Sequence, residues 1–555
     1  MWNSGETVIL RQVLLLDGVI MSKRRLRIVL VRPSVDVLYK FSKPFEALGI
    51  AYLAASLRLQ GHDVVIHDAM LHDWSIDHTL SELENSRADL IGFTVVLNHF
   101  PNRLRELLDK MQQAGTPGIV LVGGHAVSFF AERVLERVPR VDGVLSGEGD
   151  LAICEIADAL ANGQDWRRVN GVTSRDAGGH VQKVPPKRVL NLNELPWPSR
   201  DLTKAVQDND GVVCISTSRG CYARCSFCSV PRFYGLSENK PGDWLCRDVE
   251  GVVAEIENLC SQFSIRDLLI VDDEFFGGTA AGFDRAQRFA KLLSERMLGI
   301  SFAISCRAEN VRKDILTDLA QAGLSHVFVG VEAGSAQSLQ LYGKGHTVQQ
   351  NCEAADIIKS LGLSFQAGFM LFNPRSTLRD LRANVDFLKA IGEFKPMTIN
   401  SAVDPHFGAP LLGLFRRDGV LNDEGLELSV NYTDMQVRAA KAVAELCAEA
   451  FQPFMGFVAA VRSSITFEWR RKQTPWSCEE QHLLDVFEES INTTFANVFD
   501  HALNSLLNHN DTAGVIREAE QEVSNRVRQV EIAQALVADH LARSHVCLAG
   551  SVTGE

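Results

Sequence analysis

The sequence predicts an α/β protein of three successive units: a doubly wound, Rossmann-like domain, a partial (β/α)6 barrel, and a helical C-terminal domain. Short β-branched runs alternate with helical segments on both sides of a proline-rich connector, which predicts the first two units. From about residue 431 to 545, apolar residues recur at three- and four-residue steps with few β-branched clusters, which predicts the third. A chain of 555 residues is long enough for several such cores.

Composition and charge narrow the classes of partner. The chain carries 56 Lys and Arg against 69 Asp and Glu, a formal net charge of −13. Nucleic acids and anionic membrane surfaces attract concentrated positive charge, so this balance argues against both. No apolar run approaches the ~20 residues of a membrane-spanning helix. The N-terminal apolar stretch precedes its basic run, the reverse of a secretory signal.

We therefore expect a cytoplasmic protein whose 12 cysteines stay reduced. Residues 1–25 are expected to be an N-terminal extension, and either Met1 or Met21 could be the start.

Residues 26–165 are predicted to form the Rossmann-like domain. Segments 48–59 and 102–114 have apolar residues at helical spacing. The expected strands are 27–31, 63–66, 90–95, 118–122 and 143–145. This alternation predicts a parallel sheet with helices on both faces and a ligand site at the carboxyl ends of the strands.

A connector and the barrel follow. Residues 166–206 are proline-rich, and because proline interrupts helices and sheet ladders we expect a linker on the surface. Residues 207–415 show six βα-type units, which fit a barrel or an open partial barrel. Its expected strands are 212–215, 268–271, 302–304, 327–331, 365–371 and 398–399. The helical domain over 425–548 could cap the barrel, dock a carrier protein or peptide, or simply stabilise the fold.

The strongest chemical signal is the segment 220–228, which reads G-C-Y-A-R-C-S-F-C directly after the first barrel strand. Cys221, Cys225 and Cys228 could ligate one compact 4Fe-4S cluster. Such a cluster has four irons and usually four cysteine ligands, so three cysteines would leave one iron open for reaction. The alternatives are coincidence and a structural zinc site, which usually pairs two C-x-x-C knuckles, and no second knuckle exists. The other nine cysteines are isolated. Those in apolar strands or helices, such as Cys214, Cys306 and Cys352, are expected to be core residues.

This C-x-x-x-C-x-x-C loop resembles the signature of the radical S-adenosylmethionine (radical SAM) enzymes. The domain before it resembles the cobalamin-binding domain of their cobalamin-dependent branch. The similarity covers roughly residues 26–415 and implies three cofactors: a 4Fe-4S cluster on the three cysteines, SAM, and cobalamin. The segment 330–335, which reads G-V-E-A-G-S, looks like a further signature of the family.

The resemblance also implies which residues contact SAM. Acidic and basic side chains follow consecutive barrel strands, and carboxylates can pair with the ammonium and sulfonium groups of SAM. The expected SAM contacts are Tyr222, Phe227, Asp272, Asp273, Glu274, Arg307 and Glu332. We assign no catalytic side chain.

The first domain is expected to bind cobalamin. Its implied contacts are Pro33, Thr94, Gly123, Gly124, His125 and Glu148. The two glycines would let the backbone approach a large flat ligand. Cobalamin-dependent mutases and methionine synthase ligate cobalt through the His of a D-x-H-x-x-G motif. We compare that motif with residues 68–73, which lack this His, so we expect a cobalt without it. The alternative is a vestigial Rossmann module without cofactor.

The resemblance implies a cobalamin-dependent radical SAM methyltransferase that acts through a 5′-deoxyadenosyl radical on an unactivated carbon of a specialised metabolite or peptide. The alternative within enzymes is a cyclisation, rearrangement or ring contraction with the same cofactors. A non-catalytic iron–sulfur or cobalamin carrier is the third hypothesis, against which the barrel acids argue. Expected partners are a small-molecule or peptide substrate and an electron donor such as flavodoxin or ferredoxin. The loops at 372–377 and 407–411 depart from the family pattern and are expected to face substrate.

Overall fold

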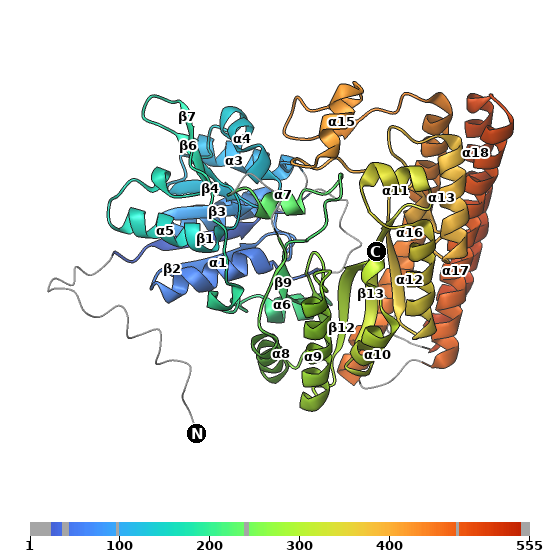
Figure 1. The fold of residues 1–555 in the computed structure, drawn as a ribbon, viewed down its shortest axis with the longest axis horizontal. Coiled ribbons are helices and arrows are strands. Elements are labelled where there is room, and N and C mark those ends of the chain that lie inside the picture. The colour runs from blue at the N-terminus through green and yellow to red at the C-terminus, as the bar shows by residue number, and fades with distance from the viewer. Residues whose placement is uncertain (1–23, 36–43, 96–98, 238–242, 473–476, 545–555) are drawn as a thin grey trace.

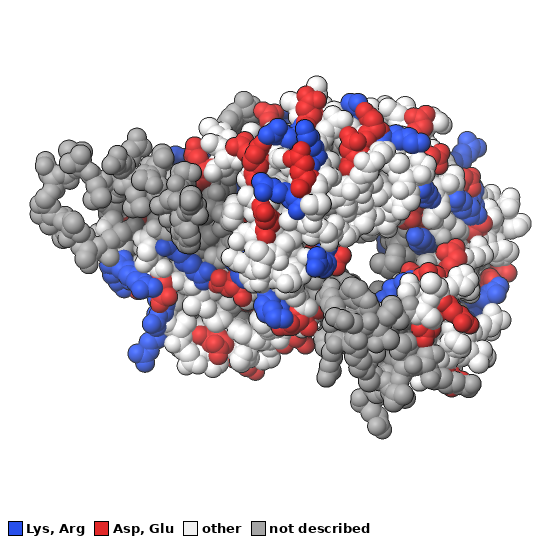
Figure 2. Space-filling model, turned by 90° about the horizontal axis from the view of Figure 1, so that it is seen from below, with Lys and Arg blue, Asp and Glu red and all other residues white. Residues whose placement is uncertain are grey.

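The computed structural model describes residues 24–35, 44–95, 99–237, 243–472 and 477–544 (Figure 1). The first domain lies at one end, the barrel in the middle and the helical domain at the other end. Charged side chains of both signs are intermixed on the face seen in Figure 2. Among the described residues, no helix is both long and apolar enough to span a bilayer.

The first domain is built on a seven-stranded sheet of order β2-β1-β3-β4-β5-β6-β7, parallel from β2 to β5. Its strands are β1 (Arg27–Arg32), β2 (Asp63–Asp68), β3 (Leu90–Thr94), β4 (Ile119–Gly123), β5 (Gly143–Leu145), β6 (Val172–Arg175) and β7 (Val181–Lys183). Its helices are α1 (Leu48–Leu59), α2 (Ile76–Ser86), α3 (Asn102–Ala114), α4 (Ala131–Arg137) and α5 (Gly149–Ala161). The five expected strands and both expected helices are therefore confirmed.

Alternate residues of each strand enter two separate cores. Ile28 and Leu30 pack with α1 and α5 on one face, whereas Val29 and Val31 pack with α2, α3 and α4 on the other. Helices therefore cover both faces, as a doubly wound sheet requires.

The connector differs from expectation in its first part. Strands β6 and β7 pair antiparallel with each other and with β5, so residues 172–183 extend the first sheet. They precede Pro185 and Pro186, so no proline interrupts their ladder.

The barrel contains a five-stranded parallel sheet of order β14-β13-β12-β11-β8. Its strands are β8 (Val213–Ile215), β11 (Asp267–Ile270), β12 (Ser301–Arg307), β13 (Leu324–Glu332) and β14 (Ser364–Phe369), and a two-stranded ribbon joins β9 (Ser218–Arg219) to β10 (Leu245–Cys246). Its helices are α6 (Thr203–Asp208), α7 (Val230–Tyr234), α8 (Val249–Phe263), α9 (Ala280–Arg296), α10 (Lys313–Gln321), α11 (Ala336–Tyr342), α12 (Val348–Ser360) and α13 (Leu378–Ala390).

The prediction of a sixth strand at 398–399 is wrong. These residues lie in the short helix α14 (Pro396–Ile399), because Pro396 occupies the first helical turn, where proline is favoured. Beyond β14, the parallel pairing continues only as a single bridge between Phe372 and Ala402.

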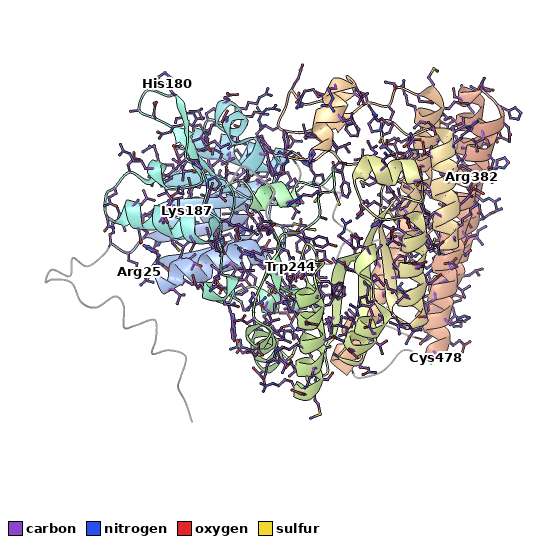
Figure 3. The ribbon with its side chains drawn as sticks, viewed as in Figure 1. Arg25, His180, Lys187, Trp244, Arg382 and Cys478 are labelled. Atoms are coloured by element: carbon purple, nitrogen blue, oxygen red, sulfur yellow. The ribbon has the colours of Figure 1, made fainter. Side chains whose placement is uncertain are left out.

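The chain after the barrel returns to the first domain and then forms the helical domain. It passes through α15 (Leu411–Arg417), β15 (Leu421–Asn422) and β16 (Ser429–Val430), and Phe407 packs against Phe130 with ring centroids 4.2 Å apart. The helical domain consists of α16 (Met435–Lys472), α17 (Cys478–Asn508) and α18 (Thr512–Ser544), which confirms the predicted helical pattern. Arg382 of α13 donates to Asp500 of α17 at 2.8 Å and ties the bundle to the barrel (Figure 3).

Candidate functional site

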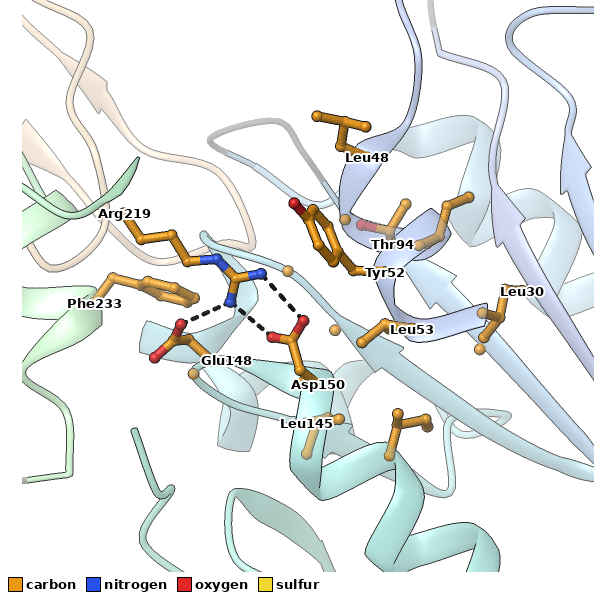
Figure 4. A pocket seen from close by; sticks show the side chains of 18 of the residues that line it. Leu30, Leu48, Tyr52, Leu53, Thr94, Leu145, Glu148, Asp150, Arg219 and Phe233 are labelled. Carbon is orange, nitrogen blue, oxygen red and sulfur yellow. Dashed lines mark hydrogen bonds and ion pairs between the residues drawn. The ribbon is translucent and has the colours of Figure 1, made fainter. Parts of the chain in front are cut away.

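A cavity of about 320 Å³ lies between the first domain and the barrel (Figure 4). The carboxyl ends of β1, β3, β4 and β5 and the start of α5 form one wall. Arg219, Phe233, Tyr234 and Asp273 from the barrel side form the other. The strand order reverses between β1 and β3, which is the switch point where open α/β sheets bind ligands.

The cavity is apolar on its sheet side and polar where the two domains meet. Leu30, Phe93, Leu121 and Leu145 line it from the sheet, and ion-paired side chains line it where the two domains meet. Such a site accepts a large ligand with an apolar portion and a few polar anchoring points.

Two glycines line the cavity at positions where the protein's own packing would also accept a larger side chain. A Cβ added at Gly49 would meet no atom within 4 Å, and one at Gly123 would come only to 3.5 Å from the Leu145 carbonyl oxygen. Gly124 is different, because its φ is +123° and a Cβ would lie 2.3 Å from the Val95 carbonyl oxygen. Open space beside Gly49 and Gly123 fits the close backbone approach that a bulky planar cofactor needs.

The structure brings four of the six expected cobalamin residues to this cavity: Thr94, Gly123, Gly124 and Glu148. Pro33 is buried but does not line it. His125 lies against the barrel instead. Its Nε2 is 2.8 Å from the Ser229 hydroxyl, and its ring stacks on Phe233 at 4.5 Å. Burial and the neighbouring His406 lower the pKa of His125 to about 4, so the imidazole is neutral at pH 7.

The comparison of residues 68–73 with the D-x-H-x-x-G motif is wrong in its placement. Asp68 ends β2, which lies at one edge of the sheet, and none of these residues lines the cavity. Asp68 is buried in an ion pair with Arg32 at 2.6 Å, and His72 is exposed. A histidine at this edge would not reach a ligand at the switch point, so its absence here does not bear on the cobalt.

The three cysteines expected to hold the cluster lie on one loop between β9 and α7. Burial is the main cause that raises the pKa of Cys221 to about 11 and that of Cys228 to about 12. Arg307 Nη1 donates to Cys225 Sγ at 2.9 Å. Metal binding displaces the protons of cysteine thiols, so this loop offers three candidate thiolate ligands.

The loop does not already have the geometry of a bound cluster. Within the described parts of the chain, no three His, Cys, Asp or Glu side chains converge on a common metal position. The loop is anchored on the barrel, because Ser226 N donates to the Tyr342 carbonyl oxygen at 2.8 Å and Leu411 N donates to the Ser226 carbonyl oxygen at 2.7 Å. Ligation by the three cysteines stays a prediction.

The three consecutive acids after β11 have different surroundings. Asp272 is buried and accepts hydrogen bonds from the backbone and hydroxyl groups of Thr217 and Ser218, so it braces the turn before the cysteine loop. Asp273 accepts from Gly220 N at 3.1 Å and lines the cavity, and desolvation in the cavity wall raises its pKa to about 6. Glu274 accepts from Asn310 Nδ2 at 2.9 Å, and Trp244 Nε1 donates to its carbonyl oxygen (Figure 3).

A second polar cluster joins the ends of β12 and β13. Arg307 donates to Glu309, and Lys344 Nζ lies 3.3 Å from Glu332, a residue with a φ of +63°. Burial alone would raise the pKa of Glu309, but hydrogen bonds from His346 and Arg307 lower it to about 2.

Of the remaining expected SAM residues, Tyr222 accepts from Asn310 Nδ2 at 3.0 Å, and Phe227 packs against Tyr342. Sequence reasoning missed Glu309, Asn310 and His346 as site residues. Glu309 and Asn310 directly follow Arg307 at the end of β12, a position that could have indicated them, whereas His346 lies beyond α11 and no local pattern indicates it.

Two family models match the chain. The B12 binding domain model covers residues 35–157, and the Radical SAM superfamily model covers residues 215–388. An uncharacterized methyltransferase of Pyrococcus horikoshii is 27% identical over 372 residues, which are 66% of this chain and 78% of that protein. The 4'-phospho-dehydrooxetanocin synthase of Priestia megaterium is 29% identical over 340 residues, 57% of this chain but only 44% of the synthase.

A solved structure shares the fold. The cobalamin-dependent S-adenosylmethionine radical enzyme OxsB with aqua-cobalamin bound superposes with a TM-score of 0.72 at 21% identity, covering 94% of this chain and 80% of OxsB. The two family models fall on the two walls of the cavity, and together they account for cobalamin, SAM and a 4Fe-4S cluster as cofactors. This chain is a radical SAM enzyme of the cobalamin-dependent branch, with its B12-binding domain ahead of the barrel.

Proposed function

We propose that this enzyme is a methyltransferase that moves a methyl group to an unactivated carbon of a specialised metabolite or peptide. The observation that carries the proposal is the shared cavity: residues of the B12-binding domain and of the barrel line one space, and that space extends to the strand that leads into the cysteine loop. A relative named as a methyltransferase, matched over 78% of its length, supports the same reading.

The cofactors supply the chemistry that amino-acid side chains lack, an organic radical and a transferable methyl group. The chain positions them and excludes water. The sheet side of the cavity is apolar and includes the buried side chains of Leu30 and Leu121. This surface favours binding of the apolar part of a ligand, which loses its contact with water there. Cys221, Cys225 and Cys228 would hold the cluster.

Around that loop, the buried guanidinium of Arg307 contributes positive charge beside Cys225 and also donates to the Lys344 carbonyl oxygen. These hydrogen bonds hold the guanidinium in place before a charged ligand binds. The protein's charges therefore need little reorganisation during the reaction.

A radical cyclisation or rearrangement without net methylation is the second candidate. The relative named 4'-phospho-dehydrooxetanocin synthase is 29% identical over 340 residues, and its name mentions no methyl transfer, which favours this alternative. The two candidates differ in the products formed from SAM.

The test uses anaerobically reconstituted full-length enzyme with SAM, hydroxocobalamin and a low-potential chemical reductant. Without substrate, a methyltransferase should form S-adenosylhomocysteine, up to one equivalent per bound cobalamin, together with slow formation of 5′-deoxyadenosine. Formation of 5′-deoxyadenosine with no S-adenosylhomocysteine would overturn methyl transfer in favour of rearrangement. Formation of neither product by iron-loaded enzyme would contradict both.

Cluster ligation is tested by metal content. Ala variants of Cys221, Cys225 or Cys228 should lose most of the roughly four irons expected per chain after reconstitution, since a cluster needs its thiolates. The matched control is Cys447→Ala, at a cysteine buried in α16 of the helical domain. If a loop variant kept its iron as the control does, that cysteine would not be a ligand.

A further inference from the structure

One arginine physically joins the two walls of the cavity. Arg219 belongs to β9 of the barrel, and it is the residue before Gly220 and Cys221, where the cysteine loop begins. Its side chain extends the other way, into the first domain (Figure 4). Nη1 donates to Glu148 Oε1 and to Asp150 Oδ2, both at 2.8 Å, and Nη2 donates to Asp150 Oδ1 at 3.1 Å.

The contact is largely buried. The side chain of Arg219 is 14% exposed, and those of Glu148 and Asp150 are 4% and 5% exposed. The guanidinium lies 5.2 Å from the centre of the Tyr52 ring, which also lines the cavity. A planar guanidinium held by two carboxylates is fixed in direction as well as in distance.

Each end of this contact is tied to one cofactor region. On the first-domain side, Glu148 and Asp150 lie at the start of α5 and line the cavity, and Val189 N donates to the second oxygen of Glu148. On the barrel side, Gly220 N donates to Asp273. The main chain of Arg219 therefore cannot move without disturbing the first residue of the cysteine loop.

We propose that Arg219 couples the two cofactor sites: cobalamin in the cavity holds Glu148, Asp150 and Arg219 in place, and with them the start of the loop beside which SAM binds. The consequence is that cobalamin tightens SAM binding, and SAM tightens cobalamin binding by the same factor, since coupling of two binding equilibria is reciprocal. Arg219 is a positioning residue in this scheme. The inference rests on the cofactors that the family supplies and is independent of whether methyl transfer or rearrangement follows.

The experiment measures binding. Iron-reconstituted, full-length enzyme is titrated with SAM by anaerobic equilibrium dialysis, with and without saturating hydroxocobalamin. We expect cobalamin to lower the Kd for SAM about tenfold, within the usual range of coupling between sites. In Arg219→Met this factor should fall to about twofold or less, and Arg219→Lys, which keeps the charge but loses the two-pronged contact, should lie between.

A matched control separates coupling from general loosening of the domains. Arg133 also bridges the first domain to the chain beyond the barrel, because it donates to the Asp423 carbonyl oxygen and packs on Phe407, but it does not line the cavity. Arg133→Met should keep the parental coupling factor. If Arg219→Met does not retain iron, Asp150→Asn is measured instead, because it removes the Arg219–Asp150 ion pair from the first-domain side and leaves Glu148 in place.

Two results would overturn the inference: a parental enzyme whose affinity for SAM ignores cobalamin, or an Arg219 or Asp150 variant that binds both ligands with the parental coupling factor. A coupled enzyme that forms no S-adenosylhomocysteine would refute the proposed methyl transfer and leave this inference intact. An enzyme that forms S-adenosylhomocysteine but shows no coupling would refute this inference and leave the proposed methyl transfer intact.

Discussion

Gly123 and Gly124 are neighbours in sequence, and the structure predicts opposite consequences for their substitution. Gly123 ends β4 with a φ that any residue can adopt, and an added side chain would extend into the cavity. Gly123→Val should therefore leave the free energy of unfolding of the cofactor-free protein within about 1 kcal/mol of the parent. The added methyl groups should cost about 1–3 kcal/mol of cobalamin binding by overpacking, a Kd weakened by roughly 5- to 140-fold.

Gly124→Ala should instead destabilise the fold. A Cβ there would lie 2.3 Å from a backbone carbonyl oxygen, and the φ of +123° is strained for any other residue, so the cost should be at least about 2 kcal/mol. Urea unfolding of the cofactor-free protein measures stability, and titration of the hydroxocobalamin absorbance measures binding. Gly251→Ala is the control, since that glycine lies in α8 with open space around it. This variant should leave cobalamin binding unchanged and raise the free energy of unfolding by up to about 1 kcal/mol, because alanine favours a helix. Parental cobalamin affinity in Gly123→Val would refute the placement of the cofactor.

Three further outcomes follow from single buried groups. Because the pKa of His125 in the folded protein is about 4, below its ordinary value of about 6.5, the unfolded state binds more protons between these values. Its stabilising contribution is complete above pH 6.5 and is lost as the pH falls toward 4. In His125→Gln, the midpoint of urea unfolding should therefore depend less on pH across that window. Parent and variant midpoints with the same pH dependence would contradict this. Asp272→Asn should lower the free energy of unfolding by about 1–3 kcal/mol, because it disturbs the hydrogen bonds from Thr217 and Ser218. Unchanged stability together with weaker SAM binding would instead show that Asp272 contacts the ligand directly. Arg32→Met should lower the free energy of unfolding by about 3–5 kcal/mol, because it leaves the Asp68 carboxylate buried and unpaired. Adding Asp68→Leu should recover most of this loss. No recovery in a thermal or urea melt would mean that the ion pair is not the cause.

Predictions that depend on neighbouring residues in the chain agree with the structure. Strands β1 to β5 and helices α1 and α3 were predictable because hydrophobic periodicity reports directly on burial of one or both faces. The failures have local physical causes as well. Residues 398–399 are β-branched, as in a strand, but the proline just before them sits favourably in a first helical turn. The short strands β6 and β7 carry too few residues for any periodic signal.

Among the site residues, the sequence by itself determined which chemical groups the chain offers: three thiols in eight residues, acids at the ends of barrel strands, and paired glycines at the end of β4. Only the tertiary structure decided which of them meet. It directs Asp272 inward to brace a turn, aims Asp273 at the cavity, holds His125 against Ser229, and joins Arg219 to Glu148 across 71 positions of sequence. Side-chain direction depends on the packing of distant segments, and neither periodicity nor motif spacing carries information about such contacts. The cavity itself is a property of two domains in contact, so it exists only after both have folded.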